Sequence, residues 1–158
     1  MKSLGFDMVS LEEGISVKHL MELYADPFIE RIKDDGMEFA PIAHPLVTYL
    51  SAFHGDEFIG AYLVVRFSDC EYEAHSLLMR KATPYSRKIG ELLIEWVFGH
   101  QGVLRLTGYV REGIQTAVNH CLKMGFKYEG FRRDALLVNG EPKGIHVLGL
   151  TRKEWCAL

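Results

Sequence analysis

A short segment between a predicted strand and a predicted helix carries the residue types best suited to hold an anion. It runs from Pro84 through Arg87 and Lys88 to Gly90. The first turn of a helix presents unpaired backbone N–H groups at the positive end of the helix dipole, which favours a phosphate or pyrophosphate. Arg87 and Lys88 would add positive charge, and Gly90 would let the anion approach the backbone closely. On this interpretation, Gly90→Val abolishes anion binding and leaves the fold intact.

The strand before this segment places three titratable side chains on one face. Glu71, Glu73 and His75 alternate along the sequence, and alternate residues of a strand share a face. His75 is the first candidate for a proton-transferring group, because an ordinary imidazole titrates close to neutral pH. Glu73 and then Glu71 follow it as candidates. The other interpretation is a polar histidine in a half-buried strand beside two solvated carboxylates.

Two amphipathic helices and a set of strands must position these groups. Apolar residues at helical spacing predict one helix over 89–97 and another over 114–122. Two shorter helical segments precede them, one over 17–24 behind a Ser16 N-cap and one begun by Pro27. β-branched and aromatic residues predict strands at 6–10, 46–53, 58–67, 72–80, 103–110, 126–138 and 145–150, with turns at 54–57 and 139–144. This order indicates an α/β (α+β) fold with a mixed sheet flanked by helices.

Composition limits the classes of protein to which the chain can belong. With 158 residues, 48% of them hydrophobic and 25% charged, it fits one globular domain spanning 1–158. A net charge of -3 argues against nucleic acid as a partner. No apolar run indicates a signal peptide or a membrane span, so we expect a cytoplasmic protein without a membrane partner. The cysteines and histidines lack metal-ligand spacing, so no metal is expected: Cys70, Cys121, Cys156, His44, His54, His100, His120 and His146.

Three stretches in a fixed order resemble a known family. Pro84, Arg87 and Gly90 fit a Pro-x-x-(Arg/Gln)-x-x-Gly loop, residues 125–133 fit a Gly-Phe-x-x-Glu-Gly-x-x-Arg segment, and 148–155 resembles a closing strand that ends in Glu-Trp. Together they resemble the GCN5-related N-acetyltransferases (GNAT), over about residues 40 to 155. Within that superfamily the chain is most similar to the branch that acetylates ribosomal-protein N-termini.

The resemblance implies a fold, a co-substrate and a reaction. The fold would be a mostly antiparallel central sheet, and the co-substrate would be acetyl-CoA. The residues implied to hold it are Arg87, Lys88, Ile89, Gly90 and Glu91. The acetyl group would pass by direct attack to a primary amine, either a small molecule or a protein N-terminus, with His75 or Glu73 as the base. Assembly into a homo-oligomer is left open.

The chain also departs from the family at positions that matter for chemistry. Leu92 stands where the loop usually ends in Gly or Ala, Ile114 where an Asn usually contacts the cofactor, and Cys121 where a Tyr usually protonates the departing thiolate. Cys121 could serve as that acid or could be a small buried hydrophobe. The departures support an alternative, because the chain also resembles small GNAT-like proteins of tailed phages. In that case a catalytically silent fold would serve binding, head assembly or an internal virion role, in host cytoplasm or virion.

Overall fold

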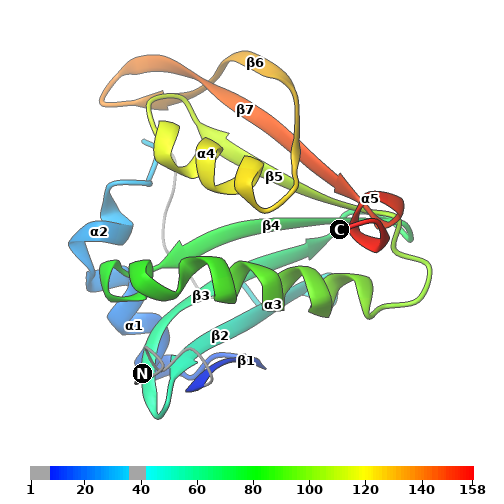
Figure 1. Cartoon of the computed structure of the whole chain (residues 1–158). Coiled ribbons are helices and arrows are strands. Elements are labelled where there is room, and N and C mark those ends of the chain that lie inside the picture. Colours follow the sequence, from blue (N-terminus) through cyan, green and yellow to red (C-terminus); the bar gives the residue numbers. More distant parts are fainter. Residues whose placement is uncertain (1–7, 36–41) are drawn as a thin grey trace.

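A seven-stranded sheet forms the centre of the protein. A computed structural model describes residues 8–35 and 42–158, and the following statements refer to these residues. The strands are β1 (Val9–Glu13), β2 (Val47–His54), β3 (Glu57–Arg66), β4 (Glu71–Leu78), β5 (Arg105–Arg111), β6 (Lys127–Val138) and β7 (Glu141–Thr151), in the order β1-β2-β3-β4-β5-β7-β6. All neighbouring pairs are antiparallel except β4 and β5. The predicted mixed, mostly antiparallel sheet is therefore confirmed (Figure 1).

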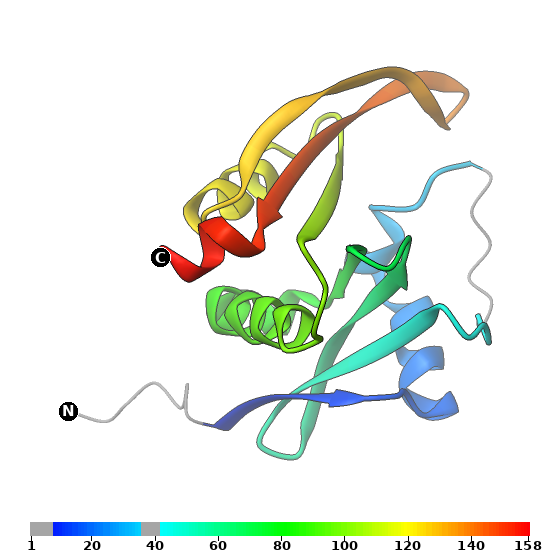
Figure 2. The same cartoon turned by 90° about the vertical axis from the view of Figure 1, so that its right-hand side faces the viewer.

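Helices cover both faces of this sheet. They are α1 (Val17–Ala25), α2 (Pro27–Glu30), α3 (Ser86–Phe98), α4 (Gln115–Lys123) and α5 (Arg152–Cys156), and a 3-10 helix, η2 (Arg80–Tyr85), leads directly into α3. Figure 2 shows α3 and α4 on one side of the strands and α1 and α2 on the other. The apolar stripe of α3 faces the sheet, and Ile89, Leu93 and Val97 lie in the larger of two hydrophobic clusters. The smaller cluster joins α1 and α2 to the other face through Leu23, Ile29 and Leu77. No helix within 8–35 and 42–158 combines the length and the apolar character needed to cross a membrane.

Three predicted element boundaries need correction. The final hairpin turns at Asn139 and Gly140, with φ of 52° and 77°, so β7 begins at Glu141 instead of 145. Asn-Gly is the strongest two-residue turn signal, and it prevails over Pro142. The chain after Thr151 forms α5 instead of continuing the strand, because Thr151 and Glu154 make a reciprocal capping box. The first strand is Val9–Glu13; residues 6 and 7 of the predicted strand lie outside the described residues.

The parallel pair β4 and β5 is joined over only part of its length. Pairing runs from Glu71 with Arg105 to Ala74 with Gly108, and beyond these residues the strands separate. On its other edge β4 stays paired with β3 as far as Leu78 opposite Gly60. A Cβ on Gly60 would lie 2.6 Å from the Leu78 Cα, so only glycine permits this close approach. We call the point where β4 and β5 separate the fork (Figure 1).

Candidate active site

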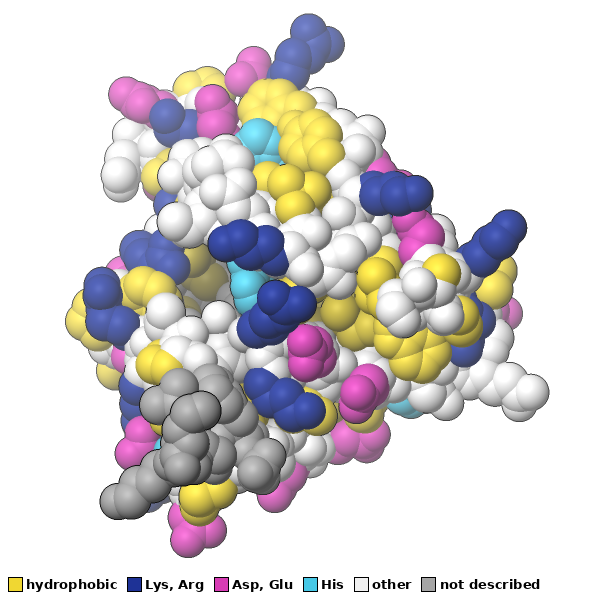
Figure 3. Space-filling model, in the orientation of Figure 1, with side chains coloured by type: hydrophobic (Ala, Val, Ile, Leu, Met, Phe, Trp, Pro, Cys, Tyr) yellow, Lys and Arg dark blue, Asp and Glu magenta, His cyan; other side chains and the backbone are white. Residues whose placement is uncertain are grey.

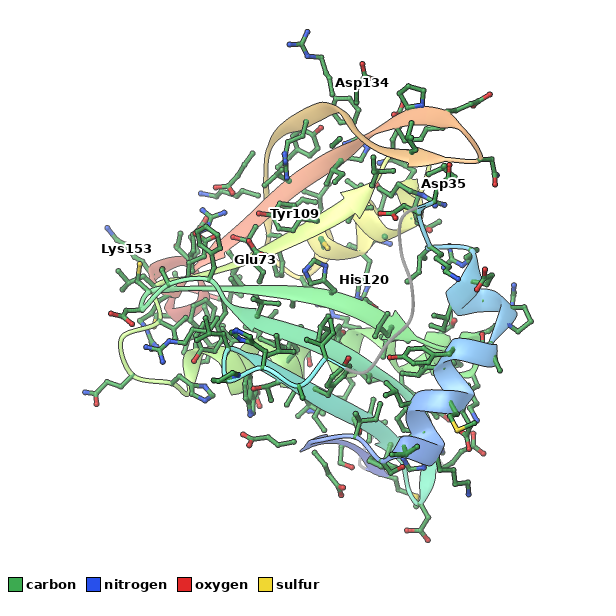
Figure 4. All side chains as sticks on the ribbon, turned by 180° about the vertical axis from the view of Figure 1, so that it is seen from behind. Asp35, Glu73, Tyr109, His120, Asp134 and Lys153 are labelled. Atoms are coloured by element: carbon green, nitrogen blue, oxygen red, sulfur yellow. The ribbon has the colours of Figure 1, made fainter. Side chains whose placement is uncertain are left out.

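His75, Glu73 and Tyr109 meet at the fork on the face that α1 and α2 cover. Tyr109 donates a hydrogen bond from its hydroxyl to Glu73 Oε1 at 3.1 Å. His75 Nε2 lies 3.9 Å from Glu73 Oε2, and the His75 and Tyr109 rings stack with centroids 6.2 Å apart. Figure 4 shows Glu73 and Tyr109 on the neighbouring strands β4 and β5. The alternation of β4 therefore places two of the predicted candidates together, and β5 adds a third group.

Burial decides the charge of the imidazole at this point. Desolvation lowers the pKa of His75 below its ordinary value, and the Glu73 carboxylate opposes part of that shift. An imidazole with a lowered pKa is neutral at pH 7 and can accept a proton. The pKa of Tyr109 is raised, first by burial and then by Glu73, so its hydroxyl keeps its proton and remains a donor. The group thus combines an imidazole with a lowered pKa, the Glu73 side chain and a phenol that keeps its proton.

Glu71 has a different role from Glu73, although both lie on the same face of β4. Its Oε2 accepts a 2.8 Å hydrogen bond from Thr107 Oγ1 and lies 3.7 Å from Arg105 Nε. Arg105 also forms a two-armed ion pair with Glu129 on β6. That pairing lowers the pKa of Glu129 and raises the pKa of Arg105. Glu71 therefore belongs to a network that joins β4, β5 and β6, whereas Glu73 lies beside the imidazole.

The predicted anion-binding residues lie at the start of α3, on the opposite face of the sheet. The Arg87 side chain is 70% exposed, and its Nε is 3.4 Å from Glu91 Oε1. Lys88 is half-buried. The side chain of Ile89 is fully buried in the core, so only its backbone could contact a ligand. Arg87 and Glu91 also line a surface hollow of about 350 Å³ that α3 shares with α4 and α5. Figure 3 shows Lys and Arg side chains gathered over α3 and α4 on this face, with acidic ones among them.

The structure gives a reason for glycine at position 90 that the sequence did not suggest. It is buried inside α3, and a Cβ there would lie 2.2 Å from the Met124 sulfur and 3.6 Å from His120 Nε2. The missing side chain lets the end of α4 pack against α3. Gly90→Val would therefore disturb the packing of the two helices, contrary to our expectation that it leaves the fold intact. The contribution of Gly90 to an anion site stays a prediction.

Cys121 lies on α4 against the larger hydrophobic cluster, which also contains Tyr62 of β3. Burial raises the pKa of the Cys121 thiol to about 11. It also raises the pKa of Tyr62, with Cys121 as a second cause. Both groups are protonated at neutral pH. However, a thiol with a pKa of about 11 transfers its proton unfavourably to a thiolate whose ordinary pKa is about 8.5. The site therefore favours the interpretation of Cys121 as a buried hydrophobe.

Sequence reasoning missed Tyr109, Thr107 and Arg111 of β5. Their alternation along the predicted strand 103–110 and its end was visible in the sequence. Identifying them also requires the parallel register between β4 and β5, which sets Thr107 opposite Glu73. No sequence pattern gave that register.

Comparison with known proteins identifies the fold. No family model matches the chain, and no curated protein matches its sequence. Among solved structures, spermidine N-acetyltransferase from Vibrio cholerae in complex with CoA and spermine matches with a TM-score of 0.80 at 11% identity, covering 95% of this chain and 99% of that one. A GCN5-related N-acetyltransferase from Brucella melitensis matches with a TM-score of 0.77 at 14% identity, covering 95% of this chain and 78% of that one. The fold is that of the GNAT acetyltransferases, as the sequence predicted. The ribosomal-protein branch and the phage similarity stay predictions.

Proposed function

We propose that this protein is an acetyl-CoA-dependent N-acetyltransferase that acts on a primary amine by direct attack. The observation that carries the proposal is the meeting of His75, Glu73 and Tyr109 at the fork, where partial burial lowers the pKa of the imidazole. A reaction of this kind needs a base that is unprotonated at neutral pH and an edge where an extended co-substrate can bind. The solved structures with this fold that are named as N-acetyltransferases support it.

The fork supplies the edge for acetyl-CoA. Beyond Ala74 the edge of β4 that faces β5 pairs with no strand in the described part of the chain, and Ser76 is exposed there on the side of α3 and α4. Backbone N–H and C=O groups on an unpaired edge can hydrogen-bond the amides of the pantetheine arm. Arg87 and Lys88 would then lie near the diphosphate, with the backbone at Ile89 and Gly90. Glu91 would hold the Arg87 side chain through their ion pair.

The chemistry requires one proton acceptor at the amine. His75 takes a proton from the substrate ammonium, either directly or through one water, and leaves a neutral amine. The amine nitrogen attacks the thioester carbonyl carbon, the C–S bond breaks, and CoA leaves as its thiolate. The nitrogen then loses its second proton, and the thiolate gains one to become the free thiol. The sum is amide, CoA thiol and one released proton. Because Cys121 is a poor donor, we place the thiolate's proton with solvent.

Binding and turnover test the proposal separately. Acetyl-CoA at about 100 times its Kd would stabilise the fold by about 2.7 kcal/mol, which raises Tm by about 5–10 °C for a chain of this size. Arg87→Ala should weaken binding by about tenfold, as expected for one charge-assisted contact. Arg66→Ala, on β3 and paired with Asp69, is the matched control.

His75→Gln tests turnover: it should keep acetyl-CoA binding and lose at least about a hundredfold in kcat. Equal kcat in His75→Gln and wild type would remove His75 from the mechanism.

A second candidate function is a GNAT fold kept for binding or assembly without catalysis. One observation favours it: the Met124 side chain packs over Gly90. This candidate includes the head-assembly or virion role and the corresponding location. Absence of any Tm rise at millimolar acetyl-CoA, together with stable self-association or partner capture, would decide for it.

A further inference from the structure

Three arginines from separate parts of the chain converge beyond the fork. Arg31 is the C-cap of α2, Arg80 begins η2 two residues after the end of β4, and Arg111 is the last residue of β5. The guanidinium carbons of Arg31 and Arg80 lie 3.8 and 4.9 Å from the centroid of the Phe28 ring. Arg111 donates hydrogen bonds to the backbone oxygens of Arg31 and Lys33 at 2.7 and 3.2 Å. The ring and these backbone bonds hold the arginine cluster in place.

Among the residues that the structure describes, no ion pair neutralises the positive charge of the arginine cluster. Within residues 8–35 and 42–158, none of the three guanidinium groups has a carboxylate oxygen within 4.0 Å, whereas Arg66, Arg87 and Arg105 each do. The pKa of Arg31 is lowered, first by burial and then by the charges of Arg80 and Arg111. Like charges held together on a rigid ring raise the free energy of the site until an anion binds.

One carboxylate shares the hollow beside the cluster. Asp26, Pro27, Phe28, Arg31 and Arg80 line a space of about 320 Å³. Asp26 Oδ1 accepts hydrogen bonds from the backbone N–H groups of Phe28 and Ile29 at 2.8 and 3.3 Å, so it caps α2. Glu30, on the same helix, lies 3.7 Å from Lys33. The guanidinium N–H groups of Arg31 and Arg80 make no hydrogen bond to any residue that the structure describes, and these donors are available to a ligand.

The arginine cluster lies on the same side of the sheet as the proposed base. Arg111 follows Tyr109 by two residues and shares its face of β5, about 7 Å further along the strand. Arg80 follows His75 by five residues, about 16 Å along an extended chain. Both arginines lie past the fork and beside α2, because Arg80 contacts the Phe28 ring and Arg111 bonds to the backbone of Arg31 and Lys33. Helix α2 lies on the side of the sheet opposite α3 (Figure 2). A molecule with its amine at His75 would reach the cluster with a group several bonds away.

We propose that the acceptor amine carries an oxyanion, a carboxylate or a phosphate, and that Arg31 and Arg80 bind it while Arg111 fixes their position. This inference rests on the proposed function, since it deepens the assignment of the acceptor. Guanidinium groups bind carboxylate and phosphate by paired charge-assisted hydrogen bonds. The same charges repel polyamines such as the spermine bound in the Vibrio cholerae structure. This chain therefore selects acceptors that carry negative charge, and disfavours positively charged ones such as spermine.

Matched acceptors that differ only in charge test the inference. The series comprises ω-aminoalkanoates of four to eight carbons, their methyl esters, aminoalkyl phosphates and spermidine. Wild type should show kcat/KM at least about tenfold higher for an acid or a phosphate than for the neutral ester. Arg31→Gln and Arg80→Gln should each remove most of that preference, and Arg66→Gln should retain it. The double variant Arg31→Glu/Arg80→Glu should prefer spermidine. Equal kcat/KM for acid and ester in wild type overturns the inference.

Two further measurements separate this inference from the proposed function. Acetyl-CoA affinity should be unchanged in Arg80→Gln; loss of acetyl-CoA binding with an unchanged acceptor preference would assign the cluster to the CoA phosphates and overturn the inference. Calorimetric titration of the same acids and esters needs no turnover. Tighter binding of the acid that Arg80→Gln abolishes supports the oxyanion site even if no amine is acetylated. No difference between acid and ester there overturns it.

Discussion

Burial gives His75 its chemical character. In water an imidazole is partly protonated near neutral pH, but desolvation at the fork shifts His75 towards its neutral form. Glu73 limits that shift from one side, and Tyr109 occupies the carboxylate oxygen that does not face the imidazole. The three side chains therefore set the pH range in which His75 can accept a proton. No single residue does so alone.

The pH dependence of turnover should report this arrangement. Because the pKa of His75 is lowered, kcat should be flat above about pH 6.5 and should fall only at lower pH, as the imidazole becomes protonated. Glu73→Gln removes the charge that raises the pKa, so the acid limb should move to still lower pH. Glu71→Gln, whose carboxylate contacts Thr107 instead, is the control. NMR titration of the His75 ring and kcat against pH would check this; an acid limb above pH 6.5 would contradict it.

At the scale of elements, the contact between α3 and α4 connects fold and site. The Met124 side chain lies where a side chain at position 90 would be, so the separation of the two helices depends on a single missing Cβ. The same contact brings His120 of α4 close to Gly90 in α3. A larger side chain at 90 would change packing before it could report on a cofactor.

Substitutions at this contact should be coupled. Gly90→Val should lower the free energy of unfolding by about 1–3 kcal/mol through overpacking against Met124. Gly90→Ala should cost less, because Met124 ends in a flexible chain and alanine gains up to about 1 kcal/mol in helix propensity. Met124→Ala in the Gly90→Val background should recover part of the loss. Urea unfolding of the wild type, Gly90→Val, Met124→Ala and the double variant gives the coupling energy. A coupling energy near zero would show that the two side chains do not compete for this space.

At the scale of the whole molecule, the two proposed half-sites lie on opposite faces of one sheet. The antiparallel block β1–β4 and the block β5–β7 are joined by only four parallel residue pairs, Glu71–Ala74 with Arg105–Gly108. The proposed base and the arginine cluster lie on the side of α1 and α2, while α3 and α4 offer the proposed acetyl-CoA surface. Because the strands separate, a co-substrate bound from one side can meet an acceptor bound from the other.

Protonation of histidines should couple the stability of the whole molecule to pH. The pKa values of His75 and His120 are both lowered, mainly by desolvation. Below about pH 6.5 these histidines bind protons in the unfolded chain but not in the folded chain. The free energy of unfolding is therefore highest above that pH and falls as the pH drops from about 6.5 through the lowered pKa values. The slope is at most about 1.4 kcal/mol per pH unit for each proton. Urea unfolding between pH 7.5 and 5.5 would measure it.

Histidine substitutions test which side chains cause this pH dependence. A His75→Gln/His120→Gln protein should show a smaller slope, while His44→Gln, at an exposed position, should keep the wild-type slope. An unchanged slope in the double variant would contradict the assignment of the pH effect to these two side chains.

The sequence alone predicts the fold class and most of the elements, but neither α5 nor the true start of β7. Hydrophobic spacing identified α3 and α4, and turn chemistry identified the first hairpin, because these signals depend on neighbours a few residues apart. The alternation of β4 placed Glu73 and His75 on one face for the same reason. The three matching stretches in their order predicted the GNAT fold that the solved structures show.

Only the tertiary structure decided which of these residues meet. Tyr109 reaches Glu73 through a parallel register between strands more than thirty positions apart. The absence of a side chain at Gly90 leaves room for Met124. Arg31, Arg80 and Arg111 converge from three segments of the chain. The pKa of His75 is likewise a property of its burial. Distances between remote segments and the dielectric around a side chain arise from packing, and no local pattern encodes them.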